Sequence, residues 1–300
     1  MDRIEEMAVF VAVAEEGGFA AASRLLNLSA PTVTRAVASL EASIGAELFV
    51  RTTRFVRLTE AGQRYLADCR RILRQLEEAE AQAAGAHIAP RGNLVIAAPV
   101  LFGQQLLVPA VVDFLAAYPA VSVRLLLVDR TVLLGEEGID AAFRMGDLPD
   151  SSLVAMPLGY IRRVVCASPA YLDAHGRPAH PSELTGHALV ASVADTRNDA
   201  WQFVDGDTRI DIAIQPRLVT STNAAAISAA ECGAGLTRVM SYQIAPALAD
   251  GRLERLLQPY EDKPLPVWLV NQEGRRAAAK LRVFLAFMAE RLRGHPALMG

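Results

Sequence analysis

A single arginine surrounded by small residues is the grouping in this sequence whose chemistry is easiest to interpret. An arginine guanidinium can donate two hydrogen bonds to one guanine, and small neighbouring side chains let a helix approach base edges closely. The residues expected to make this contact with double-stranded DNA are Ser29, Pro31, Thr32, Thr34, Arg35 and Ser39.

A helix from Ser29 to Gly45 has to hold these residues on one face. Ser29 is a good N-cap, Pro31 is tolerated only in a first turn, and Gly45 suits a left-handed C-terminal stop. Apolar residues at helical spacing predict the buried stripe, which consists of Val33, Val37, Leu40 and Ile44. At about 100° per residue, Arg35 points almost opposite that stripe.

Two further helical patterns precede this one, so the region has the form of a helix-turn-helix. A helix at 19–26 contains three consecutive alanines, which permit close crossing. The stripe of the first helix consists of Ile4, Met7, Phe10, Val11 and Ala14. An ordinary helical hairpin, with Arg35 as a solvated surface charge, is the alternative that this stretch alone leaves open.

A short β-hairpin, or wing, is expected after the helices. Residues 48–51 and 55–58 read as strands, and Arg51, Arg54 and Arg57 cluster on them. Between Arg24 and Arg74 there are nine arginines against four acids, a local charge of +5 in a chain whose total is −3. Such local positive charge favours contact with phosphates, although charge runs are usually just solvated faces.

Here the chain resembles the signature of the LysR-type transcriptional regulators. The matching pattern is Ser29-x-x-x-Val33-Thr34-Arg35-x-Val37-x-x-Leu40-Glu41-x-x-Ile44-Gly45-x-x-Leu48-Phe49-x-Arg51, then Leu58-Thr59-x-x-Gly62. Upstream, Phe10-x-x-Val13-Ala14-Glu15-x-Gly17-Gly18-Phe19 fits as well. Gly18 and Thr34 each stand where the family usually has serine. The resemblance implies a winged helix-turn-helix and a DNA-binding regulator that forms dimers and often tetramers.

A long helix at 59–85 is expected to join two such heads. Its apolar residues alternate at spacings of four and three, which is typical of a coiled coil. The predicted dimerisation seam consists of Tyr65, Cys69, Ile72, Leu76, Ala79 and Ala83. The rod would be about 39 Å long, and a homodimer would suit promoter DNA with two-fold symmetry. The alternative is an amphipathic helix packed on its own domain.

The remainder of the chain alternates strand and helix patterns, which predicts an α/β fold with a mostly parallel sheet. It is similar to the effector-binding domain of the same family, which resembles two-lobed periplasmic binding proteins. We therefore expect domains at 1–58, 59–88 and 89–300. One lobe would hold about 92–160 and 266–293, and the other the residues from 161 to 265.

A small-molecule effector is expected in the cleft, beyond the carboxyl ends of strands. The candidate contacts are Pro99, Val100, Phe102, Arg144, Thr222, Asn223 and Thr237. The helix that starts near Val100 should offer free N–H groups to a carboxylate. Val100 stands where many relatives have a hydroxyl residue, which favours a more apolar effector. For the Thr222 run the alternative role is helix capping, and for Arg144 it is a salt bridge. Trp201 and Phe203 are expected in the core.

The sequence offers no set of nucleophile, base and orienting residue, so an enzyme on a two-lobed fold is disfavoured. The histidines and cysteines show no metal-ligand spacing, so no metal or cofactor is expected, and the cysteines are predicted to be isolated buried thiols. The charged N-terminus is not expected to be a signal peptide, and no apolar run is expected to approach membrane-spanning length. Both expectations favour a cytoplasmic protein with no membrane contact. The other alternative function is a sensor that acts only through protein contacts. If the protein is a regulator, RNA polymerase is an expected partner.

Overall fold

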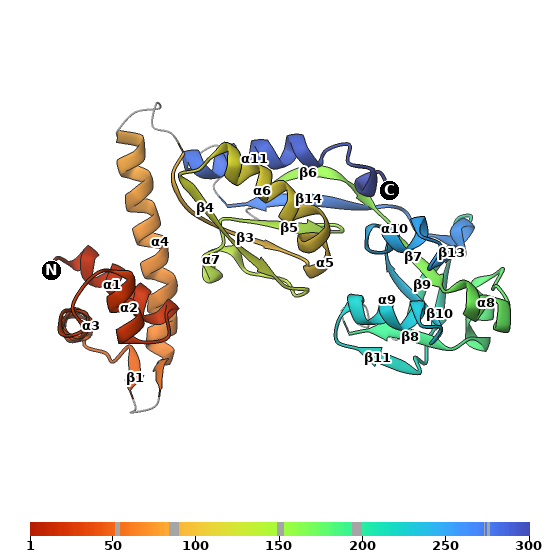
Figure 1. The fold of residues 1–300 in the computed structure, drawn as a ribbon, viewed down its shortest axis with the longest axis horizontal. Helices are drawn as coiled ribbons and strands as arrows, with labels where there is room; N and C mark the ends of the chain where they lie inside the picture. Colours follow the sequence, from red (N-terminus) through yellow and green to blue (C-terminus); the bar gives the residue numbers. More distant parts are fainter. Residues whose placement is uncertain (52–54, 84–89, 149–152, 194–199, 273, 275–276) are drawn as a thin grey trace. The chain divides into compact units, whose positions relative to one another are not determined.

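The computed structural model describes residues 1–51, 55–83, 90–148, 153–193, 200–272, 274 and 277–300. Its contacts divide the chain into two compact units (Figure 1). Unit 1 comprises Met1–Ala89 with Leu133–Ile139, and unit 2 comprises Pro90–Val132 with Asp140–Gly300.

Unit 1 is built on three helices, α1 (Arg3–Glu15), α2 (Phe19–Leu25) and α3 (Ala30–Ile44). Asp2 and Glu5 form a reciprocal capping box that fixes the start of α1. Phe10 is fully buried, and its ring lies 5.3 Å from that of Phe49 and 5.7 Å from that of Tyr65. These aromatic contacts join α1 to the wing and to the helix that follows it.

The wing and the long helix are present as expected from the sequence. Strands β1 (Phe49–Arg51) and β2 (Val56–Leu58) pair antiparallel, with Phe49 opposite Leu58. Helix α4 (Glu60–Ala83) follows, and the Thr59 hydroxyl accepts a hydrogen bond from the Gly62 amide at 2.9 Å. The short helix α7 (Leu134–Glu137) also belongs to unit 1.

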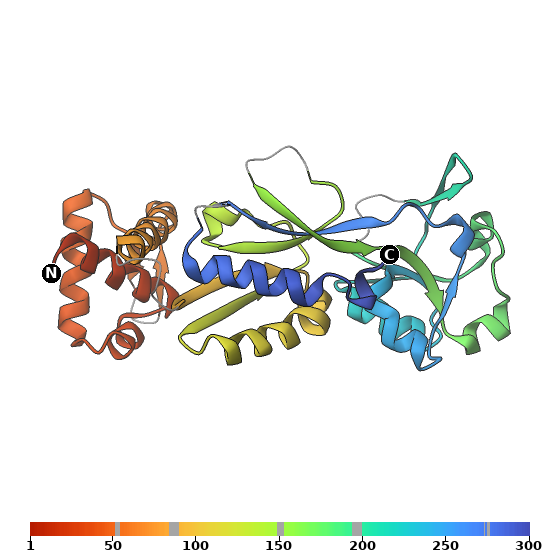
Figure 2. The same cartoon turned by 90° about the horizontal axis from the view of Figure 1, so that it is seen from above.

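Unit 2 contains two five-stranded sheets, and we call the parts built on them lobe I and lobe II (Figures 1 and 2). In lobe I the strand order is β4-β3-β5-β14-β6. The bounds are β3 (Gly92–Ala98), β4 (Val121–Leu127), β5 (Ala141–Met145), β6 (Val154–Ile161) and β14 (Leu265–Asn271).

The helices of lobe I run side by side (Figure 2). One is a continuous helical stretch, α5 (Val100–Phe102), the π-helical turn η1 (Gly103–Leu107) and α6 (Val108–Ala117). The other is α11 (Ala279–Leu292), which precedes the terminal turn η5 (Pro296–Leu298). The rings of Phe114 and Phe284 meet edge to face at 5.1 Å and join the two helices.

In lobe II the strand order is β11-β8-β12-β7-β13. The bounds are β7 (Arg163–Ala167), β8 (Leu189–Ser192), β11 (Leu218–Thr220), β12 (Leu236–Met240) and β13 (Glu254–Leu256). The helices are α8 (Pro169–His175), η2 (Pro181–Gly186), α9 (Asn223–Glu231), α10 (Ser241–Ala249) and η3 (Gln258–Tyr260). A separate hairpin pairs β9 (Ala200–Asp205) with β10 (Thr208–Ala213).

The expectation of mostly parallel sheets is wrong for four of the eight strand pairs in the two five-stranded sheets. In lobe I, β3 is parallel to β4 and β5, but β14 is antiparallel to β5 and β6. In lobe II, β12 is parallel to β8 and antiparallel to β7. Strands β6, β7 and β14, which take part in the antiparallel pairs, border the two passages of the chain between the lobes. The first passage is at Arg162 and the second lies just before Leu265.

Three smaller expectations also need correction. Ile44 is 37% exposed, and Ala36 rather than Ile44 completes the buried stripe of α3. Cys232 is exposed, whereas Cys69 and Cys166 are buried as predicted. The stretch Val100–Ala117 is long and apolar enough to cross a membrane by composition, contrary to the sequence estimate. Its Phe102 and Phe114 are fully buried in lobe I, which is typical of a core helix.

Candidate functional site

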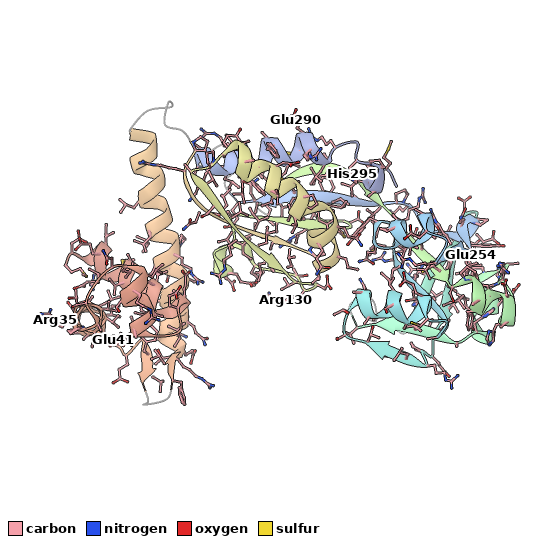
Figure 3. All side chains as sticks on the ribbon, in the orientation of Figure 1. Arg35, Glu41, Arg130, Glu254, Glu290 and His295 are labelled. Atoms are coloured by element: carbon pink, nitrogen blue, oxygen red, sulfur yellow. The ribbon has the colours of Figure 1, made fainter. Side chains whose placement is uncertain are left out.

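The exposed face of α3 carries the residues expected to contact DNA. Pro31, Thr34, Arg35 and Ser39 are exposed and Thr32 is half-buried, while Val33, Val37 and Leu40 on the opposite face are fully buried. Figure 3 shows Arg35 pointing away from the body of unit 1. The buried face therefore holds α3 in place while the polar face is left open.

Local hydrogen bonds hold several side chains of this face. The Ser29 hydroxyl accepts from the Thr32 amide at 3.3 Å and lies 2.7 Å from the Thr32 hydroxyl. The Thr34 hydroxyl donates to the Ala30 carbonyl at 3.0 Å. Arg35 Nε donates to the Pro31 carbonyl at 3.4 Å, which leaves the two terminal nitrogens of its guanidinium for other acceptors. Those two nitrogens can donate a bidentate pair of hydrogen bonds to guanine.

Glu41 fixes the wing relative to α3, a role that the sequence analysis did not identify. Its Oε1 atom accepts hydrogen bonds from the Leu48 amide at 2.9 Å and from the Phe49 amide at 3.2 Å. A carboxylate that accepts backbone N–H groups forms strong, charge-assisted bonds. Glu41, Leu48 and Phe49 all belong to the signature pattern of the sequence, but the pattern does not say that the carboxylate bonds to those two amides.

The arginines of unit 1 divide into two groups. Three on α4 are paired with acids: Arg64 with Glu60, Arg70 with Glu15 and Arg71 with Asp68. In the described part of unit 1, Arg35 and Arg57 form no ion pair, and the Arg57 guanidinium lies 4.9 Å from the centre of the Phe55 ring. Arg51 lies in β1, and Arg54 lies outside the described residues. The sequence count of +5 already subtracts Glu60 and Asp68, so among these pairs only that of Arg70 with Glu15 lowers it.

The predicted dimerisation seam is partly used within the protomer. Cys69 is fully buried with Leu66 in the core of unit 1, so it was assigned wrongly to the seam. Tyr65 is half-buried and packs against that core. Burial raises the pKa of the Cys69 thiol to about 11. Ile72 is 41% exposed and Leu76 is half-buried, while the side chains of Ala79 and Ala83 lie outside the described set. Among the predicted seam residues whose side chains are described, Ile72 is the most exposed.

In lobe I, the amide that was expected to receive an effector carboxylate already has a carboxylate partner. The Val100 N–H donates to Asp129 Oδ1 at 3.0 Å. Asp129 is exposed, and Pro99 and Val100 are half-buried at the carboxyl end of β3. A second carboxylate at this position would meet the negative charge of Asp129, so the expectation of a free N–H group is wrong for Val100.

Three other candidate effector contacts are placed elsewhere by the structure. Phe102 is fully buried, with its ring centre 5.1 Å from that of Phe143, so it belongs to the core of lobe I. Thr237 is fully buried in β12 between β7 and β8, and its hydroxyl is the one buried side-chain polar atom without a partner in the described regions. Arg144 Nη2 donates to the Val132 carbonyl at 2.8 Å.

Thr222 and Asn223 lie at the start of α9 in lobe II. The Thr222 hydroxyl accepts from the Ala225 amide at 3.2 Å, so helix capping, the alternative function, is the one observed. Asn223 is half-buried, and its Oδ1 accepts from the Ser192 hydroxyl at 2.5 Å, which orients its amide group. Pro99, Val100 and Asn223 therefore remain as candidate effector contacts.

The two lobes touch through α10. Tyr242 stacks edge to face on Phe102 at 5.7 Å, and the Gln105 side-chain amide donates to the Gln243 carbonyl at 3.3 Å. Burial raises the pKa of the Tyr242 hydroxyl. These contacts join the helix after β3 to lobe II at the end of the sheet where Val100 lies.

Comparisons with known proteins agree with this arrangement. Residues 4–63 match the model of the bacterial regulatory helix-turn-helix proteins of the lysR family, and residues 87–293 match that of the LysR substrate binding domain.

Similar full-length proteins are found as well. The chain is 36% identical to an HTH-type transcriptional regulator of Xanthomonas campestris, over 96% of this chain and 85% of that protein. It is 31% identical to the transcriptional activator AaeR of Escherichia coli, over 95% and 92% of the two chains. The solved structure of CrgA from Neisseria meningitidis, 32% identical, covers 97% of this chain and 99% of its own with a TM-score of 0.63. The chain therefore belongs to the LysR family of bacterial regulators, which join a helix-turn-helix DNA-binding domain to an effector-binding domain.

Proposed function

We propose that this regulator recognises promoter DNA through the exposed face of α3 and through the wing. The observation that carries the proposal is the orientation of Arg35, which is exposed on the side of α3 opposite the fully buried Val33 and Val37. Among the residues that the structure describes, it is paired with no acid. Small neighbours let that face approach base edges, and a helix of this kind lies in the major groove with its N-terminal part on the bases.

The test uses a DNA sequence that the wild-type protein selects from a random pool. Arg35→Ala should weaken binding to the selected sequence by about 1–3 kcal/mol per head and leave binding to unrelated DNA nearly unchanged. Arg57→Ala should weaken binding to both and reduce the salt dependence by about one unit of slope. Arg64→Ala, which removes an arginine already paired on α4, is the matched control. An unchanged preference in Arg35→Ala would exclude α3 as the base-contacting element.

We propose that the protein assembles as a dimer, or as a tetramer of two dimers, through the part of α4 that begins at Ile72. Ile72 is a large apolar residue with 41% of its surface exposed, whereas the preceding seam residues are taken up by the core of unit 1. Two heads would then match DNA with two-fold symmetry. Ile72→Asp should lower the sedimenting mass; Val50→Asp, at an exposed apolar residue of the wing, should not.

We propose a neutral, mainly apolar effector in the cleft of unit 2, at Pro99, Val100 and Asn223. The Asp129 carboxylate on the Val100 amide supports this class, because it disfavours an anion there. The effector would act by binding one arrangement of the lobes more tightly than the other and so change DNA contact and the access of RNA polymerase. A thermal-shift screen should return neutral ligands whose shift is lost in Asn223→Ala; a hit unaffected by substitution of either Val100 or Asn223 would contradict this placement.

We further propose that the chain acts in the cytoplasm, where its DNA target lies, and that it has no catalytic role. The described residues include no cluster of three groups that could hold a metal ion. Nothing in the site indicates a substrate class with which an enzyme assay could be designed.

A further inference from the structure

Lobe II contains a cluster of titratable side chains that is separate from the candidate DNA and effector contacts. Tyr171 on α8 contacts two histidines. The ring of His175 stacks on the Tyr171 ring at 4.2 Å with an interplanar angle of 13°, and the Nδ1 atom of His187 lies 3.3 Å from the Tyr171 hydroxyl. Tyr171 is buried, His187 is half-buried and His175 is exposed. We call the pair of Tyr171 and His187 the clasp.

The clasp holds the start of strand β8. The Tyr171 hydroxyl accepts a hydrogen bond from the Ala188 amide at 2.9 Å, and the Ala188 carbonyl accepts one from the Leu236 amide on β12 at 2.9 Å. A Cβ atom on Gly235 would overlap that carbonyl oxygen, so the chain segments that enter the two strands approach each other closely here. Tyr171 therefore joins α8 to two neighbouring strands of the sheet, β8 and β12.

The donors and acceptors at the clasp determine which protonation state of His187 fits. The oxygen of the Tyr171 hydroxyl accepts from Ala188, so its single hydrogen is available for the His187 Nδ1 atom. Nδ1 can accept that hydrogen only when His187 is neutral, because both ring nitrogens of a protonated histidine are donors. Protonation of His187 therefore removes the acceptor of a buried hydroxyl, and a buried donor without a partner is destabilising.

The charged groups near His187 come from several elements. Burial lowers the pKa of His187 most, the charge of His175 on α8 lowers it further, and the carboxylate of Glu183 on η2 raises it. The other charged residues on α8, on β10, which packs on η2, and in the segments next to α8 and β11 are all exposed: Asp173, Arg177, Arg209, Asp211 and Arg217.

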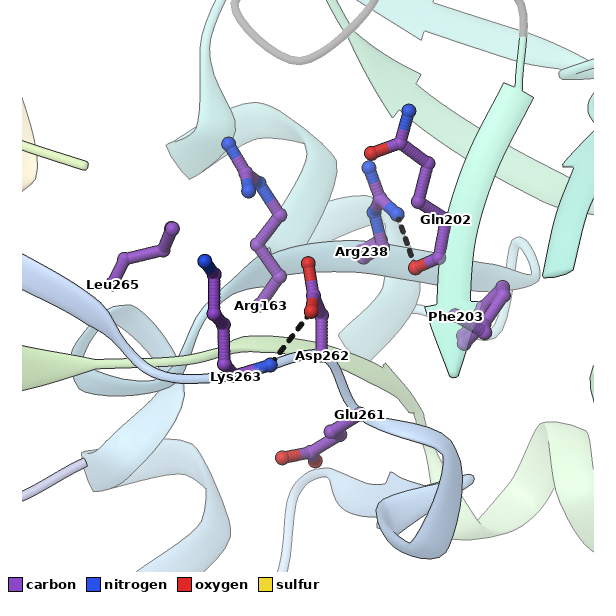
Figure 4. Close-up of a pocket in the computed structure, with 8 residues that line it drawn as sticks. All are labelled: Arg163, Gln202, Phe203, Arg238, Glu261, Asp262, Lys263 and Leu265. Atoms are coloured by element: carbon purple, nitrogen blue, oxygen red, sulfur yellow. Dashed lines mark hydrogen bonds between the residues drawn. The ribbon is translucent and has the colours of Figure 1, made fainter. Parts of the chain in front are cut away.

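Strand β12, which the clasp reaches through Ala188, carries one further cation, Arg238. Its side chain lies in the pocket that Figure 4 shows, where Nη1 donates to the Gln202 carbonyl at 3.2 Å. The lining of that pocket includes neither Tyr171 nor His187. The clasp and the pocket are therefore separate clusters of ionisable groups.

We propose that the clasp makes lobe II sensitive to pH, because protonation of His187 breaks its hydrogen bond with Tyr171 and releases the start of β8. The other end of β8 carries Ser192, whose hydroxyl donates to Asn223 at 2.5 Å. Acidification would therefore loosen the strand that orients Asn223. This consequence for the effector rests on the proposed effector site, whereas the clasp itself does not.

The test is amide hydrogen exchange of Ala188 in the full-length protein, corrected for the intrinsic effect of pH on exchange. Because the pKa of His187 is lowered from its usual 6.5 in the folded state, the open form binds a proton more readily. Opening therefore becomes easier as the pH falls through about 6.5. We expect roughly fivefold faster corrected exchange at about pH 5.5 than at about pH 7.5, the effect of losing one ordinary hydrogen bond. Corrected exchange that does not change with pH would overturn the proposal.

Matched variants connect the pH dependence to the clasp. His187→Asn keeps an acceptor oxygen near the position of Nδ1 but cannot be protonated, so the exchange of Ala188 should no longer depend on pH. Tyr171→Phe removes the hydroxyl and should give fast exchange at both pH values. His180→Asn replaces a histidine that caps η2 with another capping residue and should keep the wild-type pH dependence.

Wild-type pH dependence in either His187→Asn or Tyr171→Phe would overturn the proposal, and so would loss of the dependence in His180→Asn. Because the measurement involves neither DNA nor an effector, its outcome is independent of the proposed roles of α3 and of the cleft.

Discussion

Removal of the Glu41 side chain should release the wing from α3. In Glu41→Ala, the amides of Leu48 and Phe49 lose the oxygen that lies 2.9 Å and 3.2 Å away in the wild type. Hydrogen bonds to a charged group contribute about 1.5–3 kcal/mol each, but the two bonds share one oxygen and water can reach part of the site. We therefore expect a total loss of about 2 kcal/mol, which is below the sum of about 3–6 kcal/mol for two independent bonds.

Amide hydrogen exchange in the full-length protein measures this loss directly. A change of about 2 kcal/mol corresponds to roughly 30-fold faster exchange of the two amides, since their protection follows the free energy of local opening. Glu47→Ala is the control, because Glu47 is a nearby exposed glutamate. Wild-type exchange of both amides in Glu41→Ala, or equal acceleration in Glu47→Ala, would refute this account of the wing. DNA affinity should fall with the released wing, because Arg57 depends on it.

Three further perturbations follow from the structure. Gly62→Ala should destabilise unit 1 by several kcal/mol in thermal unfolding, because a Cβ there would overlap the Leu48 carbonyl oxygen. At pH 8, iodoacetamide should label Cys232 quickly, while the two buried thiols react only after denaturant is added; mass spectrometry counts the sites. Asp129→Asn should let the cleft accept small carboxylates near the Val100 amide, visible as new hits in a thermal-shift screen, whereas an unchanged ligand range would contradict the blocking role of that carboxylate.

The sequence predicted the features of α3 that depend on neighbouring residues. Ser29 caps the helix and Gly45, at φ +76°, ends it, because each acts through a backbone group no more than four residues away. The exposure of Arg35 followed from helical periodicity alone. Such local signals are sufficient to place a short helix and its exposed face.

The remaining contacts could not be predicted because they join distant parts of the chain. Asp129 reaches Val100 across 29 residues, and no property of either residue type indicates that pairing. The burial of Cys69 depends on how α4 docks, since a seam residue of a coiled coil and a core residue have the same spacing. Thr237 was placed in the cleft because it follows a strand pattern, but the sheet surrounds it on both sides.

The packing of α4 on its own head also has a mechanical consequence. Because Leu66 and Cys69 are locked into the core and Arg70 is bonded to Glu15 at 2.8 Å, the first turns of α4 cannot rotate independently of α3. A rotation of the helix beyond Ile72 would therefore be transmitted to the exposed face of α3. Substitutions that loosen this junction should therefore uncouple effector from DNA even when both ligands still bind.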